Sequence, residues 1–205
     1  MKLYEYPRAP NPRRVRWLMA EKGIDDIEIV EVDIVAGEHR QPGYLEKVGL
    51  PHLPALELED GVTISESIAI CRYLEARRPE PNLFGRGAEE TAIIEMWMRR
   101  CEIYLAHPLM LHVRLTHPAM AALEAPRPDI AAYNLATAER FMRTLDQRLE
   151  GREFIAADRL TIADIVTAIG VDFGRLVKYR PPEALTNFNR WYKAMMARPA
   201  ASAGG

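Results

Sequence analysis

Hydrophobic and polar positions along the first eighty residues alternate between the period of a strand and the period of a helix. Residues 3–6 form a short β-prone run, and residues 27–35 are mostly apolar, which predicts a largely buried strand. Residues 56–64 alternate apolar and polar positions on either side of Asp60-Gly61, as in a β-hairpin. Residues 65–78 then return to helical spacing.

A further helix is predicted between the first two strands. Val15, Leu18 and Met19 recur at i, i+3 and i+4 and form its buried stripe. Asn11 is placed to cap the helix, with Pro12 at the first helical position, where a missing N–H costs nothing. A polar stretch separates the second strand from the hairpin and holds at most one short helix.

The second half of the chain has no convincing strand pattern. Two prolines and two glycines interrupt the helical spacing at residues 79–87, which predicts a linker between domains. After the linker, four segments have the spacing of amphipathic helices: residues 88–115, 128–149, 161–176 and 186–197. The small-residue tail 200–205 is expected to fray.

Composition and charge exclude several classes of protein. The chain has 205 residues, 48% of them hydrophobic and 27% charged, which is typical of globular proteins. A formal charge of −2 gives no basic field for nucleic acid or anionic membranes. No signal peptide or membrane-spanning run is recognisable. Cys71 and Cys101 have no metal-binding or disulfide-framework spacing, which favours a reducing cytoplasm and predicts no metal site.

The order of elements predicts the fold class. A strand–helix–strand unit, a loop and then a strand–strand–helix unit form a small mixed sheet with helices against it, as in the thioredoxin-like α/β arrangement. An all-α helical bundle follows. We therefore expect a thioredoxin-like domain at 1–78, a linker at 79–87 and an all-helical domain at 88–205.

Two motifs carry a resemblance to a known family. Residues 50–74, LPHLPALELEDGVTISESIAICRYL, resemble the glutathione-site signature of cytosolic glutathione transferases: an apolar residue before proline, an acidic-Gly hairpin turn, and Glu-Ser opening a helix. Leu160-Thr161-Ile162-Ala163-Asp164 is similar to the helix-capping module of the family's second domain. The likeness is to bacterial-type members of the theta, nu and beta kind.

The resemblance implies a binding site for glutathione, which would act as co-substrate. In the family the proline matching Pro54 is cis, and the backbone of the residue matching Leu53 pairs with the cysteine of glutathione. Ser67 suits the γ-glutamyl carboxylate because free N–H groups and a positive dipole end lie at a helix start. Glu66 suits the γ-glutamyl ammonium. His39 and His52 are candidates to hold the glycine carboxylate.

The resemblance also locates the group that activates the glutathione thiol, and here the sequence departs from the family. Ala9 occupies the place of the usual hydroxyl residue. Asn11 is the preferred replacement, because its amide can donate a hydrogen bond to a thiolate, although a plain capping role is the alternative. Tyr6 is a second candidate hydroxyl, and Arg8 or Arg13 could supply positive charge.

Three functions follow from these features. The first is attack of the glutathione thiolate on a hydrophobic electrophile, the second is glutathione-dependent reduction of disulfides or peroxides, and the third is binding of glutathione or another ligand without catalysis. The second substrate is expected against the first long helix of the second domain, where Arg100, Tyr104 and His107 are candidate lining residues. The resemblance implies a homodimer.

Overall fold

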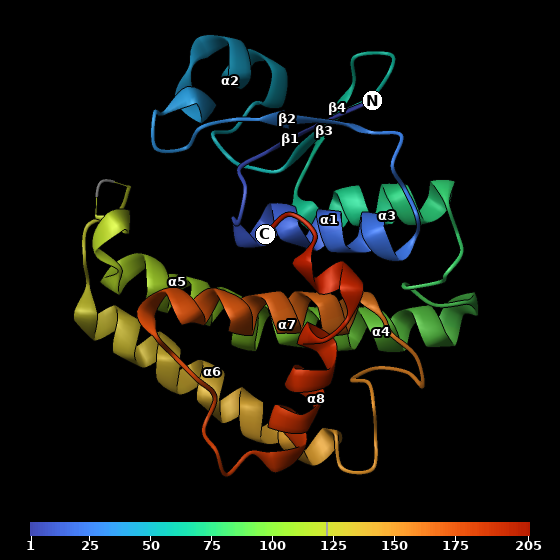
Figure 1. The fold of residues 1–205 in the computed structure, drawn as a ribbon, viewed down its shortest axis with the longest axis vertical. Coiled ribbons are helices and arrows are strands. Elements are labelled where there is room, and N and C mark those ends of the chain that lie inside the picture. The colour runs from blue at the N-terminus through green and yellow to red at the C-terminus, as the bar shows by residue number, and fades with distance from the viewer. Residues whose placement is uncertain (122) are drawn as a thin grey trace. The chain divides into compact units, whose positions relative to one another are not determined.

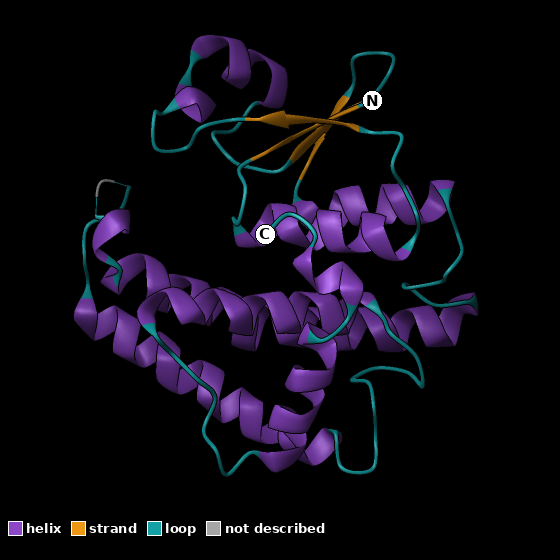
Figure 2. Cartoon of the chain, in the orientation of Figure 1, coloured by secondary structure: helices purple, strands orange, loops and turns teal. Residues whose placement is uncertain are grey.

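The computed structural model describes residues 1–121 and 123–205. The chain divides into two compact units. We call the first the N-terminal unit, which comprises Met1–Asn82 together with Pro199–Gly205, and the second the helical unit, Leu83–Arg198. Strands occur only in the N-terminal unit among the described residues (Figure 2).

The N-terminal unit contains one mixed sheet of four strands in the order β2-β1-β3-β4. The strands are β1 (Lys2–Glu5), β2 (Glu28–Glu31), β3 (Ala55–Glu57) and β4 (Thr63–Ser65). β1 runs parallel to β2 and antiparallel to β3, and β3 and β4 form the predicted hairpin, with Leu56 opposite Ile64. The small mixed sheet with helices confirms the thioredoxin-like prediction for this part of the chain.

The prediction of a largely buried second strand was wrong. β2 spans four residues rather than nine, and three of the four are exposed, including Ile29. β2 lies at the edge of the sheet, so it is covered on fewer sides than an inner strand. Only the flanking Ile27 and Val32 are buried. The mostly apolar run 27–35 thus contains a short edge strand flanked by two buried residues.

Helices cover both faces of this sheet (Figure 1). Leu3 is buried on one side of β1, where α1 (Pro10–Glu21) and α3 (Ser67–Arg77) pack together. Tyr4 points to the opposite side because side chains alternate along a strand. There its ring contacts Tyr44 of α2 (Pro42–Val48), and Lys47 of α2 forms an ion pair with Glu57 of β3 at 2.8 Å. A short 3₁₀ helix, η1 (Glu38–Arg40), precedes α2.

The helical unit confirms the all-α prediction for the second half of the chain. The predicted helix 88–115 is a continuous run of α4 (Gly87–Cys101), the π-helical segment η2 (Glu102–Ala106) and α5 (His107–Thr116). The remaining elements are η3 (Pro118–Met120), α6 (Pro128–Arg148), α7 (Ile162–Phe173), η4 (Gly174–Val177) and α8 (Thr186–Met196).

Helix α7 forms the centre of the helical unit. Every residue from 162 to 171 is buried, as expected for a helix that is apolar on all sides and surrounded by others. Gly170 allows α7 to approach the π segment closely, since a Cβ at this position would lie 2.7 Å from Cβ of Ala106. Pro108, just after the π segment, lacks the N–H that a regular helix would use, which accounts for a π bulge at this place.

The expectation that the tail frays was wrong. Residues Pro199–Ser202 form the 3₁₀ helix η5, which packs on α1, and Ala201 is buried. The segment Pro199–Gly205 groups with the N-terminal unit, although the sequence prediction assigned it to the helical domain. Its small side chains permit close packing against a helix, and this packing, rather than local propensity, orders it.

In the part of the chain that the structure describes, no helix combines the length and apolar character needed to cross a membrane. Cys71 and Cys101 are both buried and unbridged. Burial raises the pKa of each thiol to about 12, so neither forms a thiolate near neutral pH.

Candidate functional site

Helix α3 begins with an open N-terminus. Its N-cap residue, Glu66, has a φ of +70°, a left-handed conformation that a non-glycine residue adopts at a cost. The Glu66 side chain makes no hydrogen bond to the first turn of the helix. Ser67 follows as the first helical residue and is only 5% exposed. The first backbone N–H groups of a helix have no intrahelical acceptor. They therefore form a site that favours an anion.

A buried arginine adds positive charge at this helix start. Arg14 of α1 is 4% exposed and its Nη1 lies 3.4 Å from Oγ of Ser67. A guanidinium can only donate, so the serine oxygen accepts and the serine O–H is left to donate elsewhere. A carboxylate beside Ser67 would thus meet a hydroxyl donor, free backbone N–H groups and a nearby cation. The sequence prediction missed Arg14. The signal was two adjacent arginines within a predicted helix that has a buried stripe.

The strand register places the Leu53-Pro54 pair at the end of the sheet where Ser67 begins α3. Ala55 lies opposite Ser65 on one side and opposite Tyr4 on the other. Continuing past these pairs, the chain reaches Leu53-Pro54, Glu66-Ser67 and Tyr6. The Leu53-Pro54 bond is cis, as the resemblance implied. Among the described residues, no backbone hydrogen bond engages the N–H or C=O of Leu53.

Helix α1 begins differently from the prediction. Its N-cap is Ala9, so Pro10, Asn11 and Pro12 are the first three helical residues, and Asn11 does not cap the helix. Pro10 can start the helix because its fixed φ suits the first position. Pro12 is tolerated at the third because that N–H would have no acceptor within the helix. Since both prolines lack an N–H, Asn11 carries the only backbone donor among these three positions.

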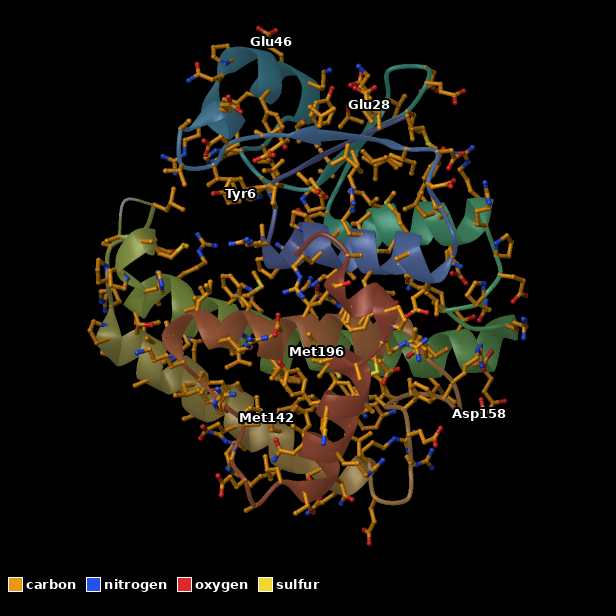
Figure 3. The ribbon with its side chains drawn as sticks, viewed as in Figure 1. Tyr6, Glu28, Glu46, Met142, Asp158 and Met196 are labelled. Atoms are coloured by element: carbon orange, nitrogen blue, oxygen red, sulfur yellow. The ribbon has the colours of Figure 1, made fainter. Side chains whose placement is uncertain are left out.

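The side chain of Asn11 also has unused hydrogen-bonding capacity. Its Oδ1 is buried and has no hydrogen-bond partner among the described residues. Rotation of the side-chain amide exchanges this oxygen for the NH₂ group, which could donate to an anion. Tyr6 follows the last residue of β1 and is half-buried (Figure 3). The predicted candidates for thiol activation thus lie on one loop and the helix start that follows it.

The two candidate histidines differ in environment. His39 in η1 is buried, and its Nδ1 has no hydrogen-bond partner among the described residues. Burial, then the charges of Arg40 and His52, lower the pKa of His39, so its imidazole is neutral at pH 7. It can therefore offer a hydrogen bond but no full charge. His52 is exposed, and its backbone carbonyl accepts the hydroxyl of Tyr44.

Arg100 and Tyr104, predicted to line the second-substrate pocket, make contacts within the helical unit. The guanidinium of Arg100 lies 5.2 Å from the ring centroid of Trp97, which also stacks under Arg148 of α6 at 4.9 Å. The rings of Tyr104 and Phe141 of α6 are 5.6 Å apart. His107, at the start of α5, is exposed. The structure does not bring these three predicted side chains together through any hydrogen bond or ring contact that it describes.

No group of three or more His, Cys, Asp or Glu side chains with the geometry to hold a metal ion occurs within residues 1–121 and 123–205.

Comparisons with known proteins show which family the chain resembles. Residues 3–82 match the family model of the glutathione S-transferase N-terminal domain, and residues 110–199 match that of the C-terminal domain. Glutathione S-transferase 2 of Saccharomyces cerevisiae is 31% identical over 98% of this chain and 87% of its own length.

Solved structures agree. A glutathione S-transferase domain-containing protein of Marinobacter aquaeolei superposes with a TM-score of 0.92 at 34% identity, covering 98% of this chain and 99% of that one. Gtt2 of Saccharomyces cerevisiae superposes with a TM-score of 0.91 at 32% identity, covering 98% of each chain. The site at the starts of α1 and α3 thus lies on a fold and sequence that these proteins share, and the chain belongs to the glutathione S-transferase family.

Proposed function

We propose that this protein catalyses attack of the glutathione thiolate on a hydrophobic electrophile. The observation that carries the proposal is the open start of α3, where Ser67 and a buried guanidinium meet unpaired backbone N–H groups. These groups suit the γ-glutamyl carboxylate of glutathione. The unpaired backbone of Leu53 suits the cysteine of glutathione, paired in the manner of strand addition.

With the γ-glutamyl carboxylate at Ser67, other residues would contact the remaining groups of glutathione. Glu66 is exposed and would accept the γ-glutamyl ammonium. His39, neutral at pH 7, would donate a hydrogen bond to the glycine carboxylate, with His52 nearby. A homodimer, a detoxification role and a cytoplasmic location belong to the proposal as what family membership implies.

Asn11 is the proposed thiol-activating residue. A free cysteine thiol has a pKa of about 8.5, so attack near neutral pH requires a site that favours the anion. The NH₂ group of Asn11, its backbone N–H and the positive end of α1 would stabilise a thiolate. Asparagine is no base at this pH, so the thiol proton would leave to solvent. With an aryl chloride the thiolate forms a C–S bond, and chloride leaves as the C–Cl bond breaks.

The test measures the pKa of the bound glutathione thiol, from thiolate absorbance, in the wild type, Asn11→Ala and Tyr6→Phe. We expect Asn11→Ala to raise this pKa by about one unit and to lower kcat/KM about tenfold below the pKa. Tyr6→Phe is the matched control, since it removes a hydroxyl from the same loop. An unchanged value in Asn11→Ala together with a raised value in Tyr6→Phe would transfer the role to Tyr6.

Two alternatives have support in the same site. Ala9 offers no hydroxyl at the family's usual position, which favours a glutathione or ligand binder without catalysis. The Pro-Asn-Pro start of α1 favours disulfide reduction, in which the thiolate attacks a disulfide sulfur and expels a thiol. Turnover of a chloronitrobenzene beside hydroxyethyl disulfide separates the three functions. Tight binding of glutathione with turnover of neither substrate would support the binder.

A further inference from the structure

Residues 199–205 form an ordered segment on the N-terminal unit. The 3₁₀ helix η5 occupies Pro199–Ser202, and Oγ of Ser202 donates to the carbonyl of Pro199 at 2.9 Å. Ala201 is only 3% exposed where η5 packs on α1. In Figure 1 the end of this segment, in red, lies beside the beginning of α1. A segment of small residues with a buried contact is part of the fold rather than a loose end.

Two arginines of α1 hold the segment. Nη2 of Arg13 donates to the carbonyl of Ala201 at 3.3 Å. Gly204 lies so close to Arg16 that a Cβ added to the glycine would be 2.9 Å from Cγ of Arg16. Gly204 also has a φ of +71°, which side chains other than glycine rarely adopt. The Gly204 backbone is therefore held in place by two constraints, its own conformation and its close contact with α1.

The segment reaches the loop that precedes α1. The backbone N–H of Arg8 donates to the carbonyl of Gly204 at 2.9 Å. Arg8 has a φ of +67°, an unfavourable conformation for a residue with a side chain, which persists only where its surroundings impose it. Arg8 directly precedes Ala9, the N-cap of α1, and lies three residues before Asn11. A bond to Gly204 thus holds the loop at the point where it sets the start of α1.

We infer that the segment 199–205 is a positioning element for the thiol-activating site. Its Gly204 carbonyl would hold Arg8 in the left-handed conformation, which fixes the start of α1 and directs the amide of Asn11 toward the glutathione sulfur. The inference rests on the proposed function. These residues, distant in sequence from Asn11, would act through Arg8 and the start of α1 and not by binding glutathione.

The sharpest variant lacks residues 203–205. It keeps the residues of η5, the buried Ala201 and the bond from Arg13. It removes the partner of the Arg8 N–H, together with the bonds that the N–H groups of Ala203 and Gly205 donate to Ala200 and Ser202. We expect the pKa of the bound glutathione thiol to rise by about one unit, with kcat/KM about tenfold lower below that pKa and recovering at higher pH. The affinity for S-methylglutathione, which has no thiol, should stay within twofold because Leu53 and Ser67 are untouched.

A point substitution provides a second route. Gly204→Ala displaces the same carbonyl through its contact with Arg16 and should raise the thiol pKa in the same direction. Gly23→Ala is the matched control, because Gly23 also has a positive φ (+61°), follows the C-cap of α1, and has no neighbour within 4 Å of an added Cβ. It should lower stability without changing the thiol pKa.

Three outcomes distinguish failure of the inference from failure of the proposed function. A wild-type thiol pKa retained in both the truncated protein and Gly204→Ala would overturn the inference. An equal loss of S-methylglutathione affinity would also overturn it, since the segment would then support the whole site. If the wild type itself does not lower the pKa of bound glutathione, the proposed function fails instead.

Discussion

The start of α7 in the helical unit differs from the starts of α1 and α3 in the N-terminal unit. In the helical unit, Asp164 closes the start of α7 by accepting four hydrogen bonds. Its Oδ1 accepts from the N–H of Ile155 at 2.9 Å and from Nε1 of Trp191 at 3.0 Å, and its Oδ2 accepts from the N–H and hydroxyl of Thr161, both at 3.0 Å. At the start of α4, Glu90 accepts the N–H of Arg86 at 2.7 Å.

In the N-terminal unit, α1 and α3 begin at Ala9 and Glu66 with no side-chain cap. Both starts carry polar groups that the fold leaves available, among them the buried Oδ1 of Asn11. A capped helix start gains stability, commonly about 1 kcal/mol per cap. An open one keeps its N–H groups for an anion. Helix α7 therefore has the more stabilising start, and in the proposed function the open starts of α1 and α3 are the ones that bind glutathione.

The largest effect should come from breaking the closed start of α7. Asp164→Ala would leave four buried donors without an acceptor, and we expect the free energy of unfolding to fall by about 3 to 5 kcal/mol. Asp164→Asn keeps the shape but replaces one acceptor oxygen with a donor, and should lose about 2 kcal/mol. Urea denaturation measures both. The comparison fails if Asp164→Ala unfolds at the wild-type urea concentration.

The open start of α3 should respond in the opposite way. Ser67→Ala removes a donor to the γ-glutamyl carboxylate, and we expect glutathione affinity to fall about tenfold, with stability changed by less than about 1 kcal/mol. Ser65→Ala, two residues earlier in β4, is the control and should leave the affinity unchanged. Calorimetric titration measures the affinity. A large loss of stability in Ser67→Ala with normal affinity would make Ser67 a structural cap.

Substitution of His39 tests a third polar group of the N-terminal unit. His39→Ala should weaken glutathione binding about fivefold, while His39→Gln, which can still donate, should stay within about twofold. The lowered pKa of His39 means that the unfolded chain binds its proton more readily. This contribution to stability is therefore complete above about pH 6.5 and is lost as pH falls through the lower, folded-state pKa. His39→Gln should show a weaker loss of stability between pH 7 and pH 5.

The smallest effect concerns the hydrogen bonds that Glu90 accepts near the start of α4. The hydrogen bond from Arg159, with that from the backbone of Arg86, lowers the pKa of Glu90 to about 2. The stabilisation is thus present above about pH 4.5 and is lost as pH falls toward 2. Because both side chains are partly exposed, we expect Arg159→Gln to cost only about 0.5 kcal/mol at pH 7. The difference from wild type should shrink in acid, and a constant difference would contradict this account.

Local sequence patterns predicted the elements whose signals are contiguous. The hairpin around Asp60-Gly61, the start of α7 at Thr161 and Asp164, and the long helices after residue 87 all depend on residues within a few positions of one another. Their turn chemistry, capping and spacing act locally, so the sequence alone contains the physical cause. The glutathione-site signature is local in the same sense, because one hairpin and one helix start carry it.

Elements whose environment depends on distant residues were not predicted. The apolar run at 27–35 could not show that β2 lies at the edge of the sheet, because strand order is a property of the whole fold. Pro10 and Pro12 both suit the first helical position, and in the structure the helix begins at Pro10. Arg14 and Ser67 are separated by 53 residues, and only the packing of α1 against α3 brings them together.

The sequence by itself determined the two-part fold, the family and the order of the groups proposed to contact glutathione, because short-range patterns encode helices, turns and caps. Only the tertiary structure decided which polar groups stay unpaired, since pairing depends on every residue that packs nearby. It also decided the role of residues 199–205. Their small side chains have weak local preferences, and the surface of α1 supplies the order that brings Gly204 to Arg8.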